Sequence, residues 1–303
     1  MKHLRCFLAA LACAGMLPMQ SAAAEPSLRI AYAGSMGAVM DRGLGPRFAR
    51  SEHIDYQGIG AGAYGLARLI AAGRLQADLF ISITPGPIRI LQRAGIVARA
   101  VPIARTQMVI AYSPKSRFAA QFQSAATGRT AWWRVLETPG LRFGRTDPAT
   151  DPQGQSIIFT MQLAQNYYHQ PHLAKRILGT ERNPAQIFTE ASLLSRLESG
   201  EIDAASGYES AVRSLHLPFI ALPSQIDLGD PAYARSYERA TIRSTVHGKA
   251  KTLHPQPLVF YAAVLKGAAN RKAARAFVAF VLSPTGQHIL RSFGYDPPLG
   301  SPL

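Results

Sequence analysis

The segment 141–168 constrains the fold more than any other, and it reads LRFGRTDPATDPQGQSIIFTMQLAQNYY. Its first three residues alternate like a short strand, and a polar loop with two Asp-Pro pairs, Asp147-Pro148 and Asp151-Pro152, follows. From Ser156 onward, apolar residues recur at helical spacing. Asp is a favoured N-cap and Pro a favoured first helical residue. We therefore predict a strand, a loop and a helix N-terminus, with Gly154 allowing a close approach of backbone.

The N-terminus of this predicted helix is a candidate anion site. Unpaired amides and the positive end of the helix dipole both favour a negatively charged guest. The same pattern also describes an ordinary strand-to-helix turn with a good cap. The segment alone leaves both interpretations open.

The first residues of the chain have the composition of a signal peptide. Two basic residues precede an apolar run, Cys6–Leu17, that is too short to span a bilayer, and Ala22–Ala24 fits a cleavage site. Both cysteines, Cys6 and Cys13, lie inside this leader. We predict a signal peptide over 1–24 and a periplasmic product that needs no disulfide and must depend on a sizeable core.

The formal net charge of the chain is +15, which limits the classes of partner. Nucleic-acid platforms bunch basic residues and interleave them with aromatic ones, whereas the basic residues here are scattered. We predict no nucleic-acid partner. An anionic ligand, or adaptation to an unusual external medium, remains to explain the charge, which would steer small anions toward the protein.

The mature N-terminal part alternates short strands and helices. Strands are predicted at Leu28–Tyr32, Ile54–Gly58 and Leu79–Ile81, each followed by a helical pattern. This order favours a parallel sheet covered on both faces. A further strand over Gln107–Tyr112 marks the first crossing between two lobes.

The rest of the chain yields a second set of elements. The patterns predict a strand at Ile202–Ala205, a turn at Gly207-Tyr208 and a crossing strand near Phe219–Leu222, and they predict local packing for Trp132 and Trp133. The predicted domains are lobe 1 over 25–108 and 223–303, and lobe 2 over 109–222.

Several short motifs, in order, resemble one family. The chain is similar to periplasmic solute-binding proteins for molybdate and tungstate, the extracellular component of an ABC importer. The motifs that carry the resemblance are Tyr32–Met36, Gly60–Ala63, Ala77–Ser82, Asp147–Gly154 with Tyr167-Tyr168, Glu198–Asp203 before Gly207-Tyr208, and Phe280–Gln287.

The resemblance implies an α/β fold of two lobes, the type II periplasmic-binding architecture, in which each lobe is a mixed, mostly parallel sheet flanked by helices. It also implies a monomer that captures a tetrahedral oxyanion by closing its lobes and presents it to a membrane permease. No enzymatic activity and no cofactor are implied. Which oxyanion is bound, and which permease receives it, stay open.

Positions that match the family's ligand contacts are expected to bind the anion through hydroxyls and amides. The resemblance implies a hydroxyl and amide contact from Ser35, backbone amides from four positions and a hydroxyl from one tyrosine: Ala63, Tyr64, Gln153, Glu190 and Tyr208. Two of these have plain structural alternatives, because Ser35 also suits a helix N-cap and Tyr208 a packed strand end.

Departures from the family pattern affect the expected selectivity. Some archaeal-type relatives use two carboxylates to make the metal of the oxyanion six-coordinate, and Asp151 matches the first of them. Gly207 stands at the expected second position, with Glu209 two residues later and expected to point elsewhere, and Ala63 stands where the family has a serine. Asp151 therefore caps its helix, or contacts the metal directly, or the ligand is a different one. Arg145 is predicted to face solvent.

The sequence carries few signals for functions other than the capture of an oxyanion. The mature chain has no thiol, no G-x-S-x-G elbow and no metalloprotease helix, and His169-x-x-His172 is predicted to be surface. Adjacent tyrosines, Tyr167-Tyr168, make ferric iron an alternative ligand. Sulfate is another, and so is a sensor that has lost its anion site.

Overall fold

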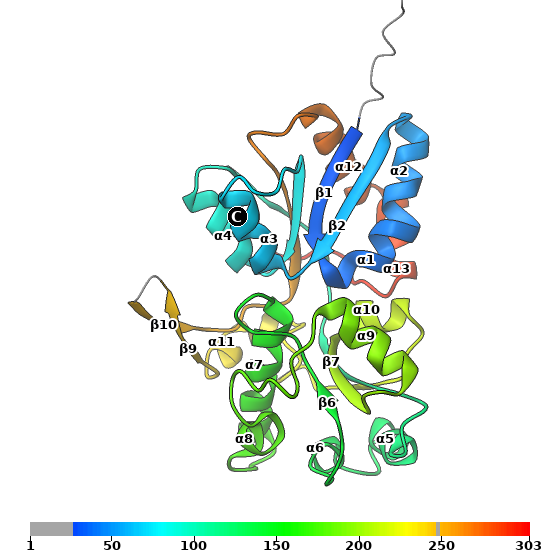
Figure 1. The fold of residues 1–303 in the computed structure, drawn as a ribbon, viewed down its shortest axis with the longest axis vertical. Coiled ribbons are helices and arrows are strands. Elements are labelled where there is room, and N and C mark those ends of the chain that lie inside the picture. Colours follow the sequence, from blue (N-terminus) through cyan, green and yellow to red (C-terminus); the bar gives the residue numbers. More distant parts are fainter. Residues whose placement is uncertain (1–26, 247–248) are drawn as a thin grey trace, which may run out of the picture.

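The structure is a computed structural model that describes residues 27–246 and 249–303. It has two lobes, one above the other in Figure 1, joined by segments that cross between them. The predicted signal peptide lies outside the described residues. Among those residues, no helix combines the length and apolarity that a membrane span requires.

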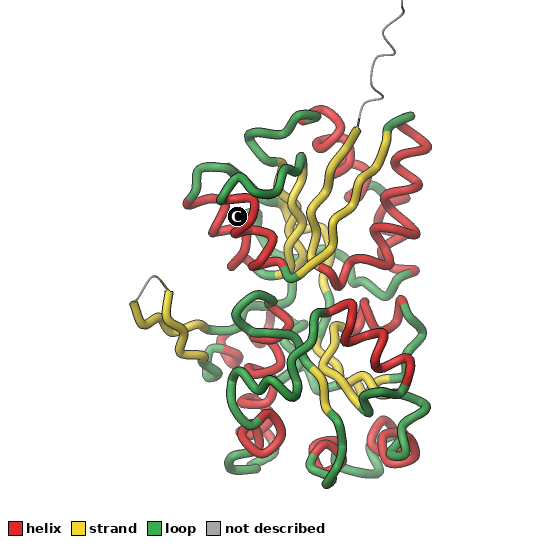
Figure 2. The backbone as a smooth tube through the Cα atoms, viewed as in Figure 1, coloured by secondary structure: helices red, strands yellow, loops and turns green. Residues whose placement is uncertain are grey.

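The first lobe is built on a five-stranded sheet in the order β2-β1-β3-β11-β4. Its strands are β1 (Ser27–Ala33), β2 (Asp55–Ala61), β3 (Leu79–Ile83), β4 (Val101–Arg105) and β11 (Val259–Val264). Its helices are η1 (Gly34–Met36), α1 (Gly37–Val39), η2 (Met40–Leu44), α2 (Gly45–Glu52), α3 (Ala63–Ala71), α4 (Pro85–Arg93), α12 (Arg271–Leu282) and α13 (Pro284–Ser292). Figure 2 shows the sheet inside the lobe with helices on both sides.

The second lobe contains a four-stranded sheet in the order β6-β7-β5-β8. Its strands are β5 (Met108–Tyr112), β6 (Phe143–Gly144), β7 (Ala204–Tyr208) and β8 (Phe219–Ala221). Its helices are α5 (Ala119–Ala126), α6 (Trp132–Leu136), α7 (Pro152–Tyr167), α8 (Leu173–Leu178), α9 (Glu190–Ser199) and α10 (Glu209–Ser214). Beside it lie η3 (Pro231–Tyr233), α11 (Ala234–Tyr237) and the hairpin of β9 (Ile242–Val246) and β10 (Lys249–Leu253).

Both sheets are mixed and mostly parallel, as predicted, because in each of them all strands but one run in the same direction. Parallel pairing joins β1 to β2 and β3, and β6 to β7. Antiparallel pairing joins β11 to β3 and β4, and β5 to β7 and β8. The reason is that β5 and β11 follow the two crossings. Each enters its sheet from the cleft, whereas the other central strands run toward the cleft.

Backbone hydrogen bonds tie the two crossing segments together. The amide of Met108 donates to Asp227 O at 2.8 Å, the amide of Leu258 to Leu228 O at 2.9 Å, and the amide of Thr106 to Leu258 O at 3.1 Å. Between the return crossing and β11, the side chain of Gln162 on α7 bonds both backbone groups of Thr241. The segment leading into β9 therefore lies against the second lobe. The domain boundaries predicted from sequence stay a prediction.

The predicted start of the long helix is confirmed. Asp151 caps α7, with its Oδ1 accepting from the amide of Gln153 at 2.9 Å, and Pro152 is the first helical residue. A Cβ built on Gly154 would lie 2.4 Å from Thr146 O and 2.6 Å from Pro148 N. Gly154 thus allows the close backbone approach that the sequence indicated, and this approach folds the Asp-Pro loop back over the first turn of α7.

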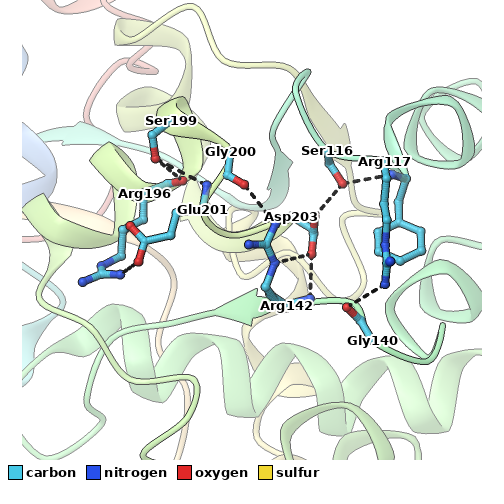
Figure 3. Close-up of polar contacts among 10 residues, drawn as sticks. Ser116, Arg117, Gly140, Arg142, Arg196, Ser199, Gly200, Glu201 and Asp203 are labelled. Atoms are coloured by element: carbon cyan, nitrogen blue, oxygen red, sulfur yellow. Dashed lines mark hydrogen bonds and ion pairs between the residues drawn. The ribbon is translucent and has the colours of Figure 1, made fainter.

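Buried Asp203 holds together three segments of the second lobe (Figure 3). Its carboxylate accepts two hydrogen bonds from the guanidinium of Arg142, one from the Arg142 amide and one from the hydroxyl of Ser116. Burial alone would raise the pKa of Asp203, but the bonds from Arg142 and Ser116 outweigh it and hold that pKa below its usual value. This cluster joins β6, β7 and the segment before α5, so it is a structural tie.

Candidate functional site

The residues predicted to bind a ligand lie where the two lobes face each other, at the ends of strands and the beginnings of helices. Ser35 follows β1, Ala63 begins α3, Asp151 and Pro152 begin α7, and Glu190 begins α9. Tyr208 ends β7, which continues through Gly207-Tyr208, where a turn was predicted. A ring of helix N-termini is an environment that favours an anion.

Contacts between the lobes bring the start of α3 against the loop before α7. The amide of Gly65 donates to Thr150 O at 3.2 Å, and Nη1 of Arg68 donates to Ala149 O at 2.9 Å. A Cβ on Gly62 would lie 2.9 Å from Thr150 O and 3.5 Å from the Cβ of Asp151. The amides at the start of α3 therefore lie close to Asp151.

The carboxylate of Glu190 reaches from the second lobe to the first. Thr189 caps α9 by accepting from the amide of Ser192, so Glu190 occupies the first helical position with its side chain free to project. A Cβ on Gly34 would lie 2.5 Å from Oε2 of Glu190, which shows how closely this carboxylate approaches the loop after β1. The sequence indicates only an amide contact from Glu190, so the approach of its carboxylate is a new finding of the structure.

Asp151 and Glu190 form a pair of buried carboxylates in the cleft. Burial raises the pKa of Asp151 to about 6, with the charge of Asp147 adding to the rise. The pKa of Glu190 is well above its usual value, chiefly because of burial and secondly because of the charge of Asp151. The hydrogen bond from the amide of Ser35 lowers that pKa by a smaller amount. The carboxyl groups of Asp151 and Glu190, which come from distant segments of the chain, are therefore buried near each other.

The expected position for a second carboxylate, Gly207, contributes none. Gly207 is buried inside β7, and a Cβ there would lie 2.7 Å from Cγ2 of Val212. Glu209 points elsewhere, as predicted, and bonds the side chains of Arg213 and Gln107. The second carboxylate found near Asp151 is that of Glu190. Its place could not be read from spacing, because α9 is far from Asp151 along the chain and reaches the loop after β1 only in the folded protein.

Unpartnered polar atoms surround the carboxylate pair. Among the described residues, Oγ of Ser35, the hydroxyl of Tyr208 and Oε1 of Glu190 are buried without a hydrogen-bond partner. The pKa of Tyr208 is well above its usual value because of burial, and the charges of Asp151 and Glu190 raise it further. Buried polar groups without partners are uncommon in proteins, so a cluster of them marks a place where a polar ligand can bind.

The structure shows the local hydrogen bonding of two predicted contacts, Ser35 and Gln153. Ser35 does not cap the helix that follows β1, since the cap position there is Ala33. Its carbonyl accepts from the hydroxyl of Tyr295 at 3.0 Å, and its buried Oγ has no hydrogen-bond partner among the described residues. The amide of Gln153 donates to Asp151, so that amide is already engaged by the helix cap.

Arg145 is fully buried, and the prediction that it faces solvent is wrong. Its guanidinium donates to Thr180 O, Glu181 O and Oε1 of Gln186, at 2.7 to 3.1 Å. Its backbone pairs with Gln186 and Phe188. Burial lowers the pKa of Arg145. The residue holds the segment that leads into α9, and these partners lie too far along the chain for spacing to reveal.

The features that suggested other ligands lie away from the cleft. Tyr167 is 44% exposed at the far end of α7, a helix about 24 Å long at the usual rise per residue. Tyr168 packs on Trp133 and accepts from the indole of Trp132, which confirms the predicted local packing of both tryptophans. His169 is exposed, as predicted. The adjacent tyrosines are therefore not part of the pocket between the lobes.

Comparisons with known proteins agree on the class of molecule. The sequence matches the family described as "Bacterial extracellular solute-binding protein" over residues 28–296. It is 30% identical over 215 residues to the molybdate/tungstate-binding protein WtpA of Pyrococcus abyssi, covering 65% of this chain and 61% of that protein. The chain spans about three fifths of the length of the curated relatives it matches.

Solved structures share the fold at low sequence identity. The periplasmic molybdate-binding protein of Azotobacter vinelandii superposes with a TM-score of 0.63 at 16% identity, covering 90% of this chain and all of that chain (100%). The sulfate-binding protein SubI of Mycobacterium tuberculosis superposes with a TM-score of 0.57 at 16% identity, and the match covers 90% of this chain and 87% of that chain. These neighbours are type II periplasmic binding proteins, which confirms the predicted fold class.

Proposed function

This chain belongs to the bacterial extracellular solute-binding protein family, and we propose that it captures molybdate or tungstate between its lobes for an ABC importer. The periplasmic location and the handover to a membrane permease are part of this proposal. A relative at 30% identity that is named a molybdate/tungstate-binding protein supports the choice of ligand.

The observation that carries the proposal is the carboxylate pair of Asp151 and Glu190 among helix N-termini. A carboxylate beside a bound dianion is unfavourable, by about 4 kcal/mol for each pair of unit charges 4 Å apart at an effective dielectric of 20. The arrangement becomes favourable if the two carboxylates bind the metal at the centre of the oxyanion. Molybdenum and tungsten accept two further oxygen ligands, whereas the sulfur of sulfate does not.

The remaining polar groups of the pocket complete this mode of binding. Hydroxyls of Ser35 and Tyr208, and the first amides of α3 at Ala63 and Tyr64, replace the water around the oxo groups. Contacts come from both lobes, so the ligand stabilises the closed arrangement relative to an open one. We propose that Asp151 and Glu190 lose their protons to solvent as the metal expands from four to six oxygen ligands.

Removing either pocket hydroxyl tests the assignment of the oxo contacts. We expect Ser35→Ala and Tyr208→Phe each to weaken tungstate binding by about tenfold, the value of one hydrogen bond to a charged group. Neither change should unfold the protein, because neither hydroxyl bonds another described residue. Isothermal titration, with thermal unfolding of each variant as the control, measures both effects. Unchanged affinity in both variants would remove these two assignments.

Titration of the wild-type protein against an anion panel tests the proposed function itself. We expect heat of binding from molybdate and tungstate, and none from sulfate at the same concentrations. Tight sulfate binding would assign the protein to the sulfate class. Colour on addition of ferric iron would assign it to the iron class. Absence of binding by any of these ligands would favour a protein that has kept the fold and lost transport.

A further inference from the structure

A cavity of about 980 Å³ opens between the lobes beside the buried pocket. Its walls are α3 and α4 of the first lobe, the beginning of α7 with the loop before it, and the residues after β10. We call this space the vestibule. It is far larger than a tetrahedral oxyanion requires, and the pocket residues Ser35, Asp151, Glu190 and Tyr208 do not line it.

Three residues separate the vestibule from the pocket and border both. Tyr64 lines the vestibule and follows Ala63 at the start of α3. Pro152 lines it and follows Asp151. Ser156 lines it, and its hydroxyl is close enough to Tyr208 to lower the pKa of that residue against the effect of burial. A ligand in the vestibule therefore contacts residues that adjoin the pocket residues Ala63, Asp151 and Tyr208.

The charge of the vestibule is opposite to that of the pocket. Arg68, Arg89 and Arg93 line it, and among the described residues none of those lining it is acidic. Arg89 and Arg93 are exposed, one helical turn apart on α4, and neither takes part in an ion pair with another described residue. The positive charges of all three arginines reach the hydroxyl of Tyr64, since each of them lowers the pKa of Tyr64. Burial raises that pKa by a larger amount.

Wherever Asp151 and Glu190 are ionised, a dianion that approaches the pocket directly meets two carboxylates. Their negative potential then opposes its approach until the metal is close enough to be ligated. A basic wall next to the pocket offsets that barrier, because charges that line a cleft concentrate ions of opposite sign there and raise association rates by ten to a thousand times, as a rough range. Such an effect weakens as salt screens the charges.

We propose that Arg89 and Arg93, with Arg68, form an outer binding site in the vestibule, where a doubly charged tetrahedral oxyanion is held before it passes Tyr64 into the pocket. This inference rests on the proposed function, since it concerns the route to the same pocket. Arg68 also bonds Ala149 O across the cleft, so Arg89 and Arg93 are the two arginines whose removal leaves the contacts between the lobes intact.

The test compares association rates of two double variants that change the net charge equally. Arg89→Gln/Arg93→Gln removes the vestibule pair, and Arg271→Gln/Arg275→Gln removes a pair with the same spacing on α12, which lies away from the cleft in Figure 1. Rapid filtration with radiolabelled tungstate gives association and dissociation rates at low and high salt.

We expect the vestibule variant to bind tungstate about tenfold more slowly at low ionic strength, with an unchanged dissociation rate. The difference should shrink at high salt, and the α12 variant should follow the wild type. Equal association rates in the two variants would overturn the outer site while leaving the proposed function intact. An effect only on dissociation would also overturn it. A wild-type protein that binds no oxyanion would overturn both.

Discussion

Replacing Glu190 by Gln should reduce the affinity for molybdate and tungstate by about 100-fold or more, because the metal loses a ligand that a neutral amide replaces poorly. Asp151→Asn should have a similar effect. Asn is also a favoured N-cap, so α7 keeps its start and the loss reports on the ligand contact. Sulfate affinity should stay equal or rise in both variants, since a negative charge is removed from an anion pocket.

Asp147→Asn provides the matched control for these substitutions. Asp147 belongs to the same loop, but its carboxylate bonds the amide of Ala149 and pairs with Arg182 outside the pocket. Isothermal titration of the three variants with tungstate and sulfate gives the comparison. If Glu190→Gln bound tungstate as tightly as Asp147→Asn, the carboxylates would not be ligands of the metal.

Binding of tungstate should become tighter as pH rises from about 6 to 8. In the free protein the pKa of Asp151 is about 6 and that of Glu190 is well above its usual value, so protons occupy the pair over part of this range. Ligation of the metal requires the ionised forms. Each proton released on binding therefore increases the affinity by up to about tenfold per pH unit.

The opposite slope would identify a different mode of binding. Protonated carboxyls of Asp151 and Glu190 can donate hydrogen bonds to oxo groups, and affinity would then fall as pH rises through their pKa values. Titrations in buffers of different ionisation enthalpy distinguish the two modes, since they count protons released or taken up. Glu190→Gln is the internal control, because it should remove part of the pH dependence.

Local patterns predicted the elements that depend on nearby residues. The cap at Asp151, the proline after it and the small residue at Gly154 are all explained by contacts within the loop and the first turn of α7. Capping and helical periodicity act over a few residues, so a sequence records them directly.

The features that were missed depend on contacts between distant segments. Arg145 is buried because carbonyls from a later loop accept its hydrogen bonds, and Glu190 reaches the pocket because α9 packs against the loop after β1. The one antiparallel strand of each sheet could not be read from local patterns either, because β5 and β11 enter their sheets from the cleft after a crossing between lobes. Alignment to a family pattern placed the second carboxylate at Gly207, a position without a side chain.

X-ray absorption at the tungsten edge of the tungstate-loaded protein tests the central claim most directly. If carboxylates of Asp151 and Glu190 close on the metal, the spectrum should show the four oxo atoms and two further oxygen neighbours at a longer distance. In Glu190→Gln, one of these two longer-distance oxygen neighbours should be lost. A spectrum with four oxygen neighbours, unchanged from free tungstate, would contradict the account.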